Sequence, residues 1–147
     1  MRLDEQLVNA INLAVEVHSE QTDKNNQPYI NHVLRVMNAG QTIQEKIVGA
    51  LHDVIEDSPM TIEDLLNKGY SNEIVEAVNA MTFYNNSESY DEYINRLINN
   101  PIAARVKLND LTDNMDLRRL SSLDEEAVGR LKKYFKAYKQ IINSFSK

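Results

Sequence analysis

The sequence contains no cysteine, which excludes disulfide bonds and thiolate metal sites and fits a reducing compartment. No apolar run approaches the roughly 20 residues that span a membrane, and the charged residues 1–5 lack the apolar segment of a signal peptide. We therefore expect a cytoplasmic protein without a membrane partner.

Positive charge is also scarce. The chain has 16 Lys and Arg against 22 Asp and Glu, a formal net charge of −6. Long nucleic acid binds to basic surfaces, so it is not an expected partner. A phosphate-binding site must instead be local, built from a metal ion and a few lysine or arginine side chains.

No internal repeat, low-complexity tract or linker divides the chain, so we expect one domain over residues 1–147. Apolar residues recur at helical spacing nearly throughout, and no segment shows sustained period-two alternation. The predicted helices cover residues 3–19, 28–39, 43–56, 61–69, 71–81, 90–99, 101–115 and 124–145. In the last of these, the side chains expected to face inward are Val128, Leu131, Phe135, Tyr138 and Ile142. The predicted fold class is all-α, a single-domain bundle of about seven or eight helices.

Residues 51–57, Leu-His-Asp-Val-Ile-Glu-Asp, hold the highest concentration of side chains that could bind a metal or carry a proton. At about 100° per residue, one face of a helix collects His52, Asp53, Glu56 and Asp57. This spacing alone fits a solvated polar face. Imidazole with carboxylate is also the ligand set of a divalent metal that keeps open coordination positions.

A second polar face lies on the predicted helix 101–115, where Lys107, Asp110 and Asn114 point the same way. An ammonium, a carboxylate and an amide suit a metal-bound phosphate, although a polar surface explains the spacing equally. His32 lies at the edge of an apolar arc, which is typical of a hydrogen-bonded residue at the rim of a core. His18 lies on an apolar stripe, and we interpret it as a packing residue or a partner of the site.

Taken in order, three segments resemble the HD-domain superfamily, and within it the hydrolase domain of the Rel/Spo alarmone enzymes and their small single-domain relatives. Residues 21–32 resemble the family segment Q-x-R-K-x-G-x-P-Y-I-x-H, residues 51–58 resemble L-H-D-V-x-E-D-T, and residues 106–115 resemble K-L-A-D-x-x-x-N-M. The resemblance covers most of the chain and implies an HD-type helical bundle.

The resemblance also implies a metal-dependent phosphohydrolase that removes the 3′-pyrophosphate from guanosine tetra- or pentaphosphate. The residues that match the family's ligands for a divalent metal, usually manganese, are His32, His52, Asp53 and Asp110. Those that match the acidic pair beside the attacking water are Glu56 and Asp57. Those that match positions lining the nucleotide site are Lys24, Lys107 and Asn114.

Some positions depart from the family pattern. Asp23 stands in place of an arginine, Asn26 in place of a glycine, Asp113 in place of a histidine, and residues 82–84 where small relatives often have basic side chains. The metal set stays complete, while the substrate pocket is expected to be more acidic. Repulsion from Asp23 is expected to weaken binding of the alarmone by roughly tenfold.

The implied mechanism is metal-assisted hydrolysis, with Glu56 or Asp57 carrying the proton. The sequence leaves open which of the two does so. One alternative is an HD phosphohydrolase that acts on another nucleotide, which Asp23 favours. Another is a regulatory module that binds metal or nucleotide without turnover, which the acidic pair disfavours. The oligomeric state also stays open, a homo-oligomer included.

Overall fold

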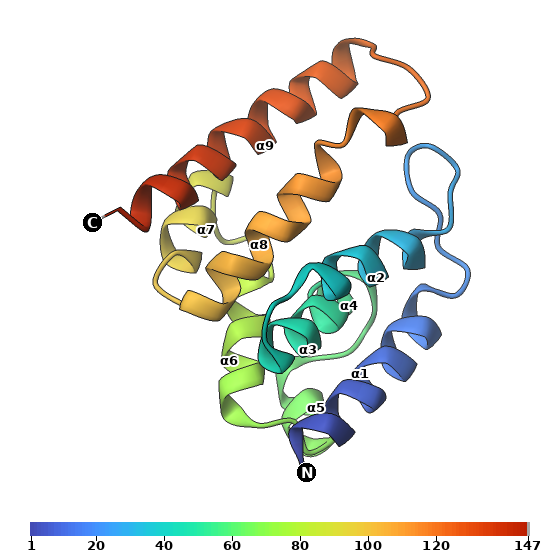
Figure 1. The fold of residues 1–147 in the computed structure, drawn as a ribbon, viewed down its shortest axis with the longest axis vertical. Helices are drawn as coiled ribbons and strands as arrows, with labels where there is room; N and C mark the ends of the chain where they lie inside the picture. Colours follow the sequence, from blue (N-terminus) through green and yellow to red (C-terminus); the bar gives the residue numbers. More distant parts are fainter. Residues whose placement is uncertain (147) are drawn as a thin grey trace.

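The structure, a computed structural model, describes residues 1–146 and is built from helices (Figure 1). Their bounds are α1 Leu3–His18, α2 Tyr29–Ala39, α3 Ile43–Leu51, α4 Val54–Asp57, α5 Ile62–Asn67, α6 Asn72–Met81, α7 Tyr90–Leu97, α8 Pro101–Asn114, the 3₁₀ helix η1 Leu117–Arg119 and α9 Glu125–Ser144. Within residues 1–146 no strand forms, and an isolated bridge joins Thr22 to Pro28 across the first polar loop. The predicted all-α class is confirmed.

Local signals set most helix starts. Thr61 and Ser89 each form a capping box, in which the hydroxyl accepts from the backbone N–H three residues on and the acidic side chain there bonds back to the cap. Asn100 caps α8 and Pro101 occupies its first turn, where a missing N–H costs nothing. These ends match the predicted ones to within a few residues.

The predicted helix 43–56 is wrong as a single element, because it breaks at His52 and Asp53 into α3 and α4. Asp53 has φ −108° and ψ 3°, outside the helical region. The Nδ1 of His52 lies 2.6 Å from the carbonyl oxygen of Gly49, which a continuous helix would offer to the Asp53 N–H. The break buries His52 and Asp53 in the interior.

Helix α3 is the centre of the fold and packs against α1, α2, α6 and α8. Its side chains Ile47, Val48 and Leu51 are fully buried. Gly49 allows a close approach to α2, since a Cβ at this position would lie 2.9 Å from the Cα of Met37. His52 and Asp53, which follow α3 directly, are therefore anchored to a buried helix that packs against four others.

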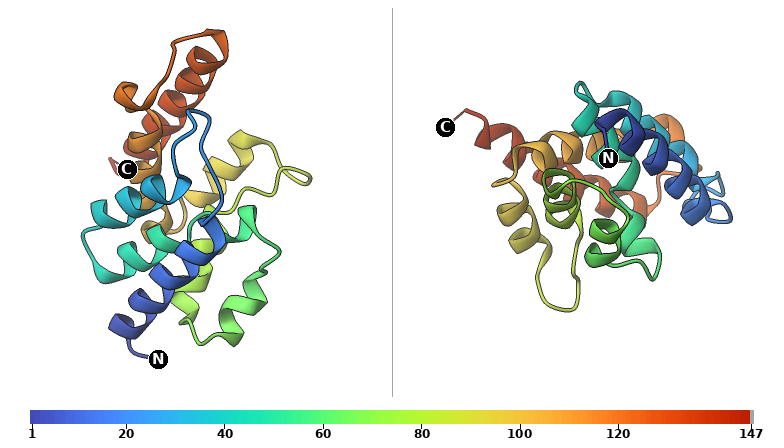
Figure 2. Two further views of the ribbon diagram at one scale, coloured as in Figure 1. Left: turned by 90° about the vertical axis from the view of Figure 1, so that its right-hand side faces the viewer. Right: turned by 90° about the horizontal axis from the view of Figure 1, so that it is seen from below.

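Helix α9 covers α8 and α7 on one side of the bundle, while α1 lies on the other side (Figures 1 and 2). Its buried residues are Ala127, Ala137 and Ile141. The inward placement of Phe135 is wrong, because the residue is 56% exposed, with Nζ of Lys139 5.5 Å from the ring centroid. Small residues let α9 lie close to its neighbours, so the buried face follows alanines rather than the largest apolar side chains.

The first polar loop and the segment after η1 lie side by side in both views of the fold (Figures 1 and 2). The backbone N–H and the hydroxyl of Ser121 donate to Oδ1 of Asn25 at 2.9 and 3.1 Å. Among residues 1–146, none of the helices is both long enough and apolar enough to cross a bilayer.

Candidate active site

A buried cluster of potential metal ligands lies where α2 meets the break between α3 and α4. It comprises His32, His52 and Asp53, whose ligand atoms all lie within 4.8 Å of one another. Asp110 joins them from α8, with its Oδ1 3.0 Å from Nε2 of His32 and 3.4 Å from Nε2 of His52. The fold thus brings together all four residues that the sequence predicted as ligands.

The outer nitrogens of both imidazoles are held by acceptors. Nδ1 of His52 faces the Gly49 carbonyl, which accepts only, so this nitrogen carries a proton. Nδ1 of His32 lies 2.6 Å from Oδ2 of Asp113, and a carboxylate likewise accepts. In the neutral rings the two Nε2 atoms therefore present lone pairs toward the carboxylates of the cluster.

Lone pairs facing carboxylate oxygens need a cation between them. Nε2 of His52 is buried without a hydrogen-bond partner, although Oδ2 of Asp53 lies only 2.9 Å away. Two imidazoles and two carboxylates form a ligand set for a divalent metal ion, and the outer hydrogen bonds fix the rings as such sites require. The residues present therefore fit a metal site.

Electrostatics within the cluster agree with a site for positive charge. Burial by itself lowers the pKa of His52, but Asp53 and Asp110 outweigh it and raise the pKa well above its usual value. Burial raises the pKa of Asp53, but His52 outweighs it and lowers the pKa to about 2. The carboxylates stay ionised and attract either protons on the imidazoles or a metal ion in their place.

Three further side chains hold the carboxylates of the cluster. The Tyr29 hydroxyl donates to Oδ2 of Asp53. Lys107 Nζ lies 2.9 Å from Oδ2 of Asp110, and Nδ2 of Asn114 lies 3.1 Å from its Oδ1. The shared face predicted for α8 is confirmed. Lys107 is directed at Asp110 and lies over the Tyr93 ring, 5.2 Å from its centroid, rather than in the open cavity.

The predicted acidic pair extends from α4 beside the cluster. Oε1 of Glu56 accepts the Phe83 N–H at 2.5 Å, and Oδ2 of Asp57 accepts from Nε2 of Gln21 at 3.1 Å. Burial, with Asp53 adding to it, raises the pKa of Glu56 to about 7. Burial also raises the pKa of Asp57. Glu56 is therefore poised to exchange a proton near neutral pH.

An open cavity of about 430 Å³ lies over these groups, a size suited to a nucleotide. Asp53, Glu56 and Asp57 form one part of its wall. The part suited to a nucleotide's base, sugar and phosphates comprises Lys24, Asn114, Arg119, Arg130 and Tyr134. We call this the catalytic cavity. Two of the three residues predicted to bind substrate, Lys24 and Asn114, line it.

Asp23 does not present an isolated negative charge to this cavity. Its Oδ2 lies 3.2 Å from Nη2 of Arg119, and its Oδ1 accepts the N–H groups of Asn25 and Gln27 at 2.8 and 3.0 Å. The expected acidic pocket is thus offset locally by an arginine that the motif comparison did not include.

Sequence reasoning missed the roles of Tyr29, Asp113 and Arg119. Tyr29 lies inside the first motif, and Asp113 was noted only as a departure from the third. Arg119 lies beyond the motifs, and its contact with Asp23 joins residues 96 positions apart. No local periodicity signals such a contact.

No family model matches the chain. The chain is similar to the guanosine-3′,5′-bis(diphosphate) 3′-pyrophosphohydrolase of Aquifex aeolicus (strain VF5), with 27% identity over 122 residues. That match covers 76% of this chain but only 17% of the relative. Among solved structures, a metazoan ortholog of SpoT that hydrolyzes ppGpp and plays a role in starvation responses matches with a TM-score of 0.71 and 24% identity. This match covers 95% of this chain and 84% of the other.

The chain therefore shares the all-helical fold of that solved structure, as expected for the predicted fold class. Within that class, the resemblance to the alarmone hydrolases that the three motifs indicated is confirmed by both relatives.

Proposed function

We propose that this chain is a metal-dependent phosphohydrolase that removes the 3′-pyrophosphate from guanosine tetraphosphate-like alarmones, and that residues 1–147 form one catalytic domain. The observation that carries the proposal is the buried His–Asp cluster, with the unpartnered Nε2 of His52, which reaches a nucleotide-sized cavity through Asp53. The names of the two relatives support the choice of substrate.

The residues that would hold a divalent cation, in our proposal manganese, are His32, His52, Asp53 and Asp110. When bound, such an ion polarises a phosphoryl oxygen and lowers the pKa of water. The mixed imidazole and carboxylate set is compatible with manganese, which is also the usual metal of the family that the motifs resemble. The absence of cysteine supports a cytoplasmic setting.

The chain's own side chains carry the rest of the reaction. Water attacks the phosphorus that is bonded to the 3′ oxygen. The bond between this phosphorus and the 3′ oxygen breaks, pyrophosphate leaves, and the 3′ oxygen takes up a proton. Glu56, with its pKa near neutral, is our candidate to accept the water proton, and Asp57 is the second acid within the cavity. Lys24 would offset phosphate charge, Asn114 would bind the nucleotide, and Lys107 would hold Asp110 in place from its buried position.

The test is a release assay over a panel of nucleotides with and without manganese. We expect guanosine tetraphosphate to give guanosine diphosphate and pyrophosphate only when metal is present. Asp53→Asn, which keeps the size of a proposed ligand but weakens its donor, is the inactive control. Lack of metal-dependent release from every nucleotide in the panel would refute the proposal.

One observation favours a second candidate, an HD phosphohydrolase that acts on a different nucleotide. Asp23 replaces the arginine of the alarmone hydrolases and binds Arg119 instead. The same panel separates the candidates, because another nucleotide would then be hydrolysed faster than guanosine tetraphosphate. A binding module without turnover would not need Glu56 beside the cluster.

A further inference from the structure

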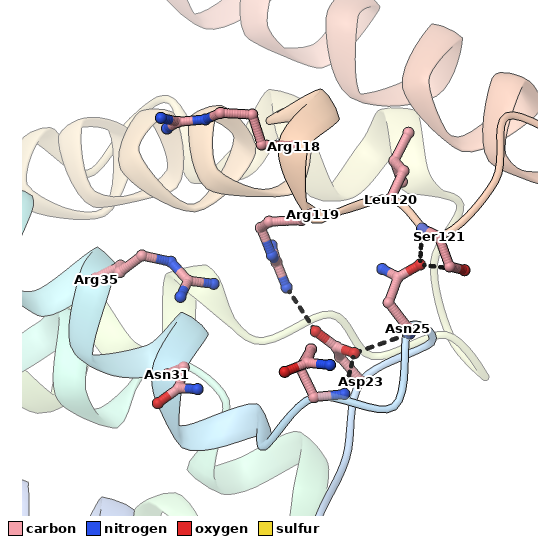
Figure 3. A pocket seen from close by; sticks show the side chains of 9 residues that line it. Asp23, Asn25, Asn31, Arg35, Arg118, Arg119, Leu120 and Ser121 are labelled. Carbon is pink, nitrogen blue, oxygen red and sulfur yellow. Dashed lines mark hydrogen bonds and ion pairs between the residues drawn. The ribbon is translucent and has the colours of Figure 1, made fainter.

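A second cavity of about 410 Å³, whose lining residues are drawn in Figure 3, adjoins the catalytic cavity. Asp23, Asn25, Arg119 and Leu120 line both cavities, so the two share a wall. Arginines lie along the second cavity from two elements that are distant in sequence, Arg35 on α2 and Arg118 and Arg119 on η1. We call this the arginine cavity.

The gathering of arginines is unusual in a chain with a net charge of −6. Arg35 uses Nε and Nη2 on Asp113, and Arg118 uses Nε and Nη2 on Asp116. Within residues 1–146, no hydrogen bond to a protein acceptor engages Nη1 of Arg35 or Nη1 of Arg118. A guanidinium has five N–H donors, so both arginines keep donors for an anion.

Arg119 forms the wall between the cavities. Its Nη1 bonds Oδ2 of Asp113 at 2.9 Å and Oδ1 of Asn114 at 3.2 Å, while its Nη2 reaches Asp23. In Figure 3 its side chain extends from η1 directly toward Asp23. Three partners from two other segments fix this guanidinium, so it offers an oriented positive charge to both cavities.

We propose that the arginine cavity binds the 5′-diphosphate of the same nucleotide whose 3′-diphosphate is cleaved in the catalytic cavity. This inference rests on the proposed function and adds to it a requirement for substrates phosphorylated at both ends. The nucleoside lies in the catalytic cavity, and Arg119 stands between the two phosphorylated ends. Guanidinium groups suit this ligand because their paired N–H donors match phosphate oxygens. No bond is made or broken in the arginine cavity.

The kinetic test compares two substrates, guanosine 3′,5′-bis(diphosphate) and guanosine 3′-diphosphate, which lacks the 5′ group. The variant is Arg118→Gln, because among residues 1–146 the Arg118 side chain hydrogen-bonds only to Asp116. The control is Lys136→Gln, with the same change of charge on an exposed residue of α9 that pairs with Asp91. We expect Arg118→Gln to raise KM for the first substrate by about threefold to tenfold, with kcat unchanged. KM for the second substrate should stay constant, and Arg118→Lys should recover part of the loss.

The result that would overturn the inference is an equal KM change for both substrates, or no change for either. A binding measurement separates this failure from failure of the proposed function. Calorimetric titration of guanosine 5′-diphosphate in EDTA needs no turnover and no metal. If the parent hydrolyses no nucleotide, the proposed function fails, yet weaker binding in Arg118→Gln than in Lys136→Gln still assigns a diphosphate site to this cavity. Equal binding by both variants removes that site as well.

Discussion

His32 and Asp113 lie 2.6 Å apart, Nδ1 to Oδ2, and join α2 to α8 across 81 positions of sequence. Asp113 is itself held by Arg35 and Arg119, at 2.7 and 2.9 Å. Its orientation therefore depends on the arginines of the second cavity. The residue that departs from the family's histidine orients a proposed metal ligand.

The first prediction follows from that contact. Asp113→Asn should weaken manganese binding by about tenfold to a hundredfold, because the outer hydrogen bond fixes the ring and its tautomer. Titration of the metal-free protein with manganese measures this affinity. The matched control is Asp116→Asn, the same change at a residue whose side chain, within residues 1–146, hydrogen-bonds only to Arg118. Equal affinities in the two variants would remove Asp113 from the metal site.

The second prediction separates ligands from the proton carrier. Asp53→Ala should lose both metal and activity, whereas Glu56→Gln should bind metal normally and lose about 10²–10⁴ in kcat. Burial raises the pKa of Glu56 to about 7, and a bound cation lowers the pKa of a nearby carboxyl. The kcat of the parent should therefore fall as pH drops from 7, because protonated Glu56 cannot accept the water proton. Elemental analysis and pH–rate profiles measure these effects. If Glu56→Gln turns over at the parent rate, Asp57 becomes the candidate.

The third prediction concerns pH and metal affinity. The pKa values of His32 and His52 are raised, because Asp110 and its neighbours outweigh burial, which by itself lowers them. Protonation therefore stabilises the metal-free fold, fully below the unfolded pKa, and this contribution is lost as pH rises through the folded pKa values. Manganese must displace these protons, so its affinity should rise with pH and its binding should release protons. Calorimetry in two buffers of different ionisation enthalpy measures the release. Affinity independent of pH would contradict this assignment of the protons.

The sequence predicted most of the helices because they depend on local signals, and the four proposed ligands came from motifs that each lie within one segment. Capping residues mark α5, α7 and α8, and apolar spacing marks α1 and α6. The break at Asp53 was not predictable from periodicity, because it depends on the His52 side chain turning inward to the cluster. The exposure of Phe135 depends on how closely α9 approaches α8, which pattern alone does not specify.

The candidate active site, like the fold, was predictable only where the signal lies within one segment of the chain. The motifs identified residues that lie together in one segment of the chain, such as His52 and Asp53. They did not identify the hydrogen-bond and ion-pair partners that come from other segments. Arg119 comes from a 3₁₀ turn with no motif, and its role depends on the distant loop that carries Asp23. Long-range ion pairs of this kind need the fold before they can be read.

The last prediction tests that ion pair. If Asp23 repels the alarmone, as the motif comparison indicates, Asp23→Arg should strengthen binding by restoring the family's arginine. In the structure it would place two guanidinium groups together and remove the acceptor for the Asn25 and Gln27 N–H groups. We therefore expect Asp23→Arg to raise KM for guanosine tetraphosphate by about tenfold, and Arg119→Asp to do the same, since the pair is largely shielded from solvent.

The double variant Asp23→Arg with Arg119→Asp should return KM to within about threefold of the parent, because the swap restores opposite charges across the wall of the cavity. The exposed pair Asp91 and Lys136 provides a matched swap that should leave KM unchanged throughout. Steady-state kinetics of the four proteins at two salt concentrations measure the coupling, which should change little with salt because the pair is partly buried. Additive effects in the double variant would show that Asp23 and Arg119 act on the substrate independently, and a KM below the parent's in Asp23→Arg alone would restore the expectation drawn from sequence.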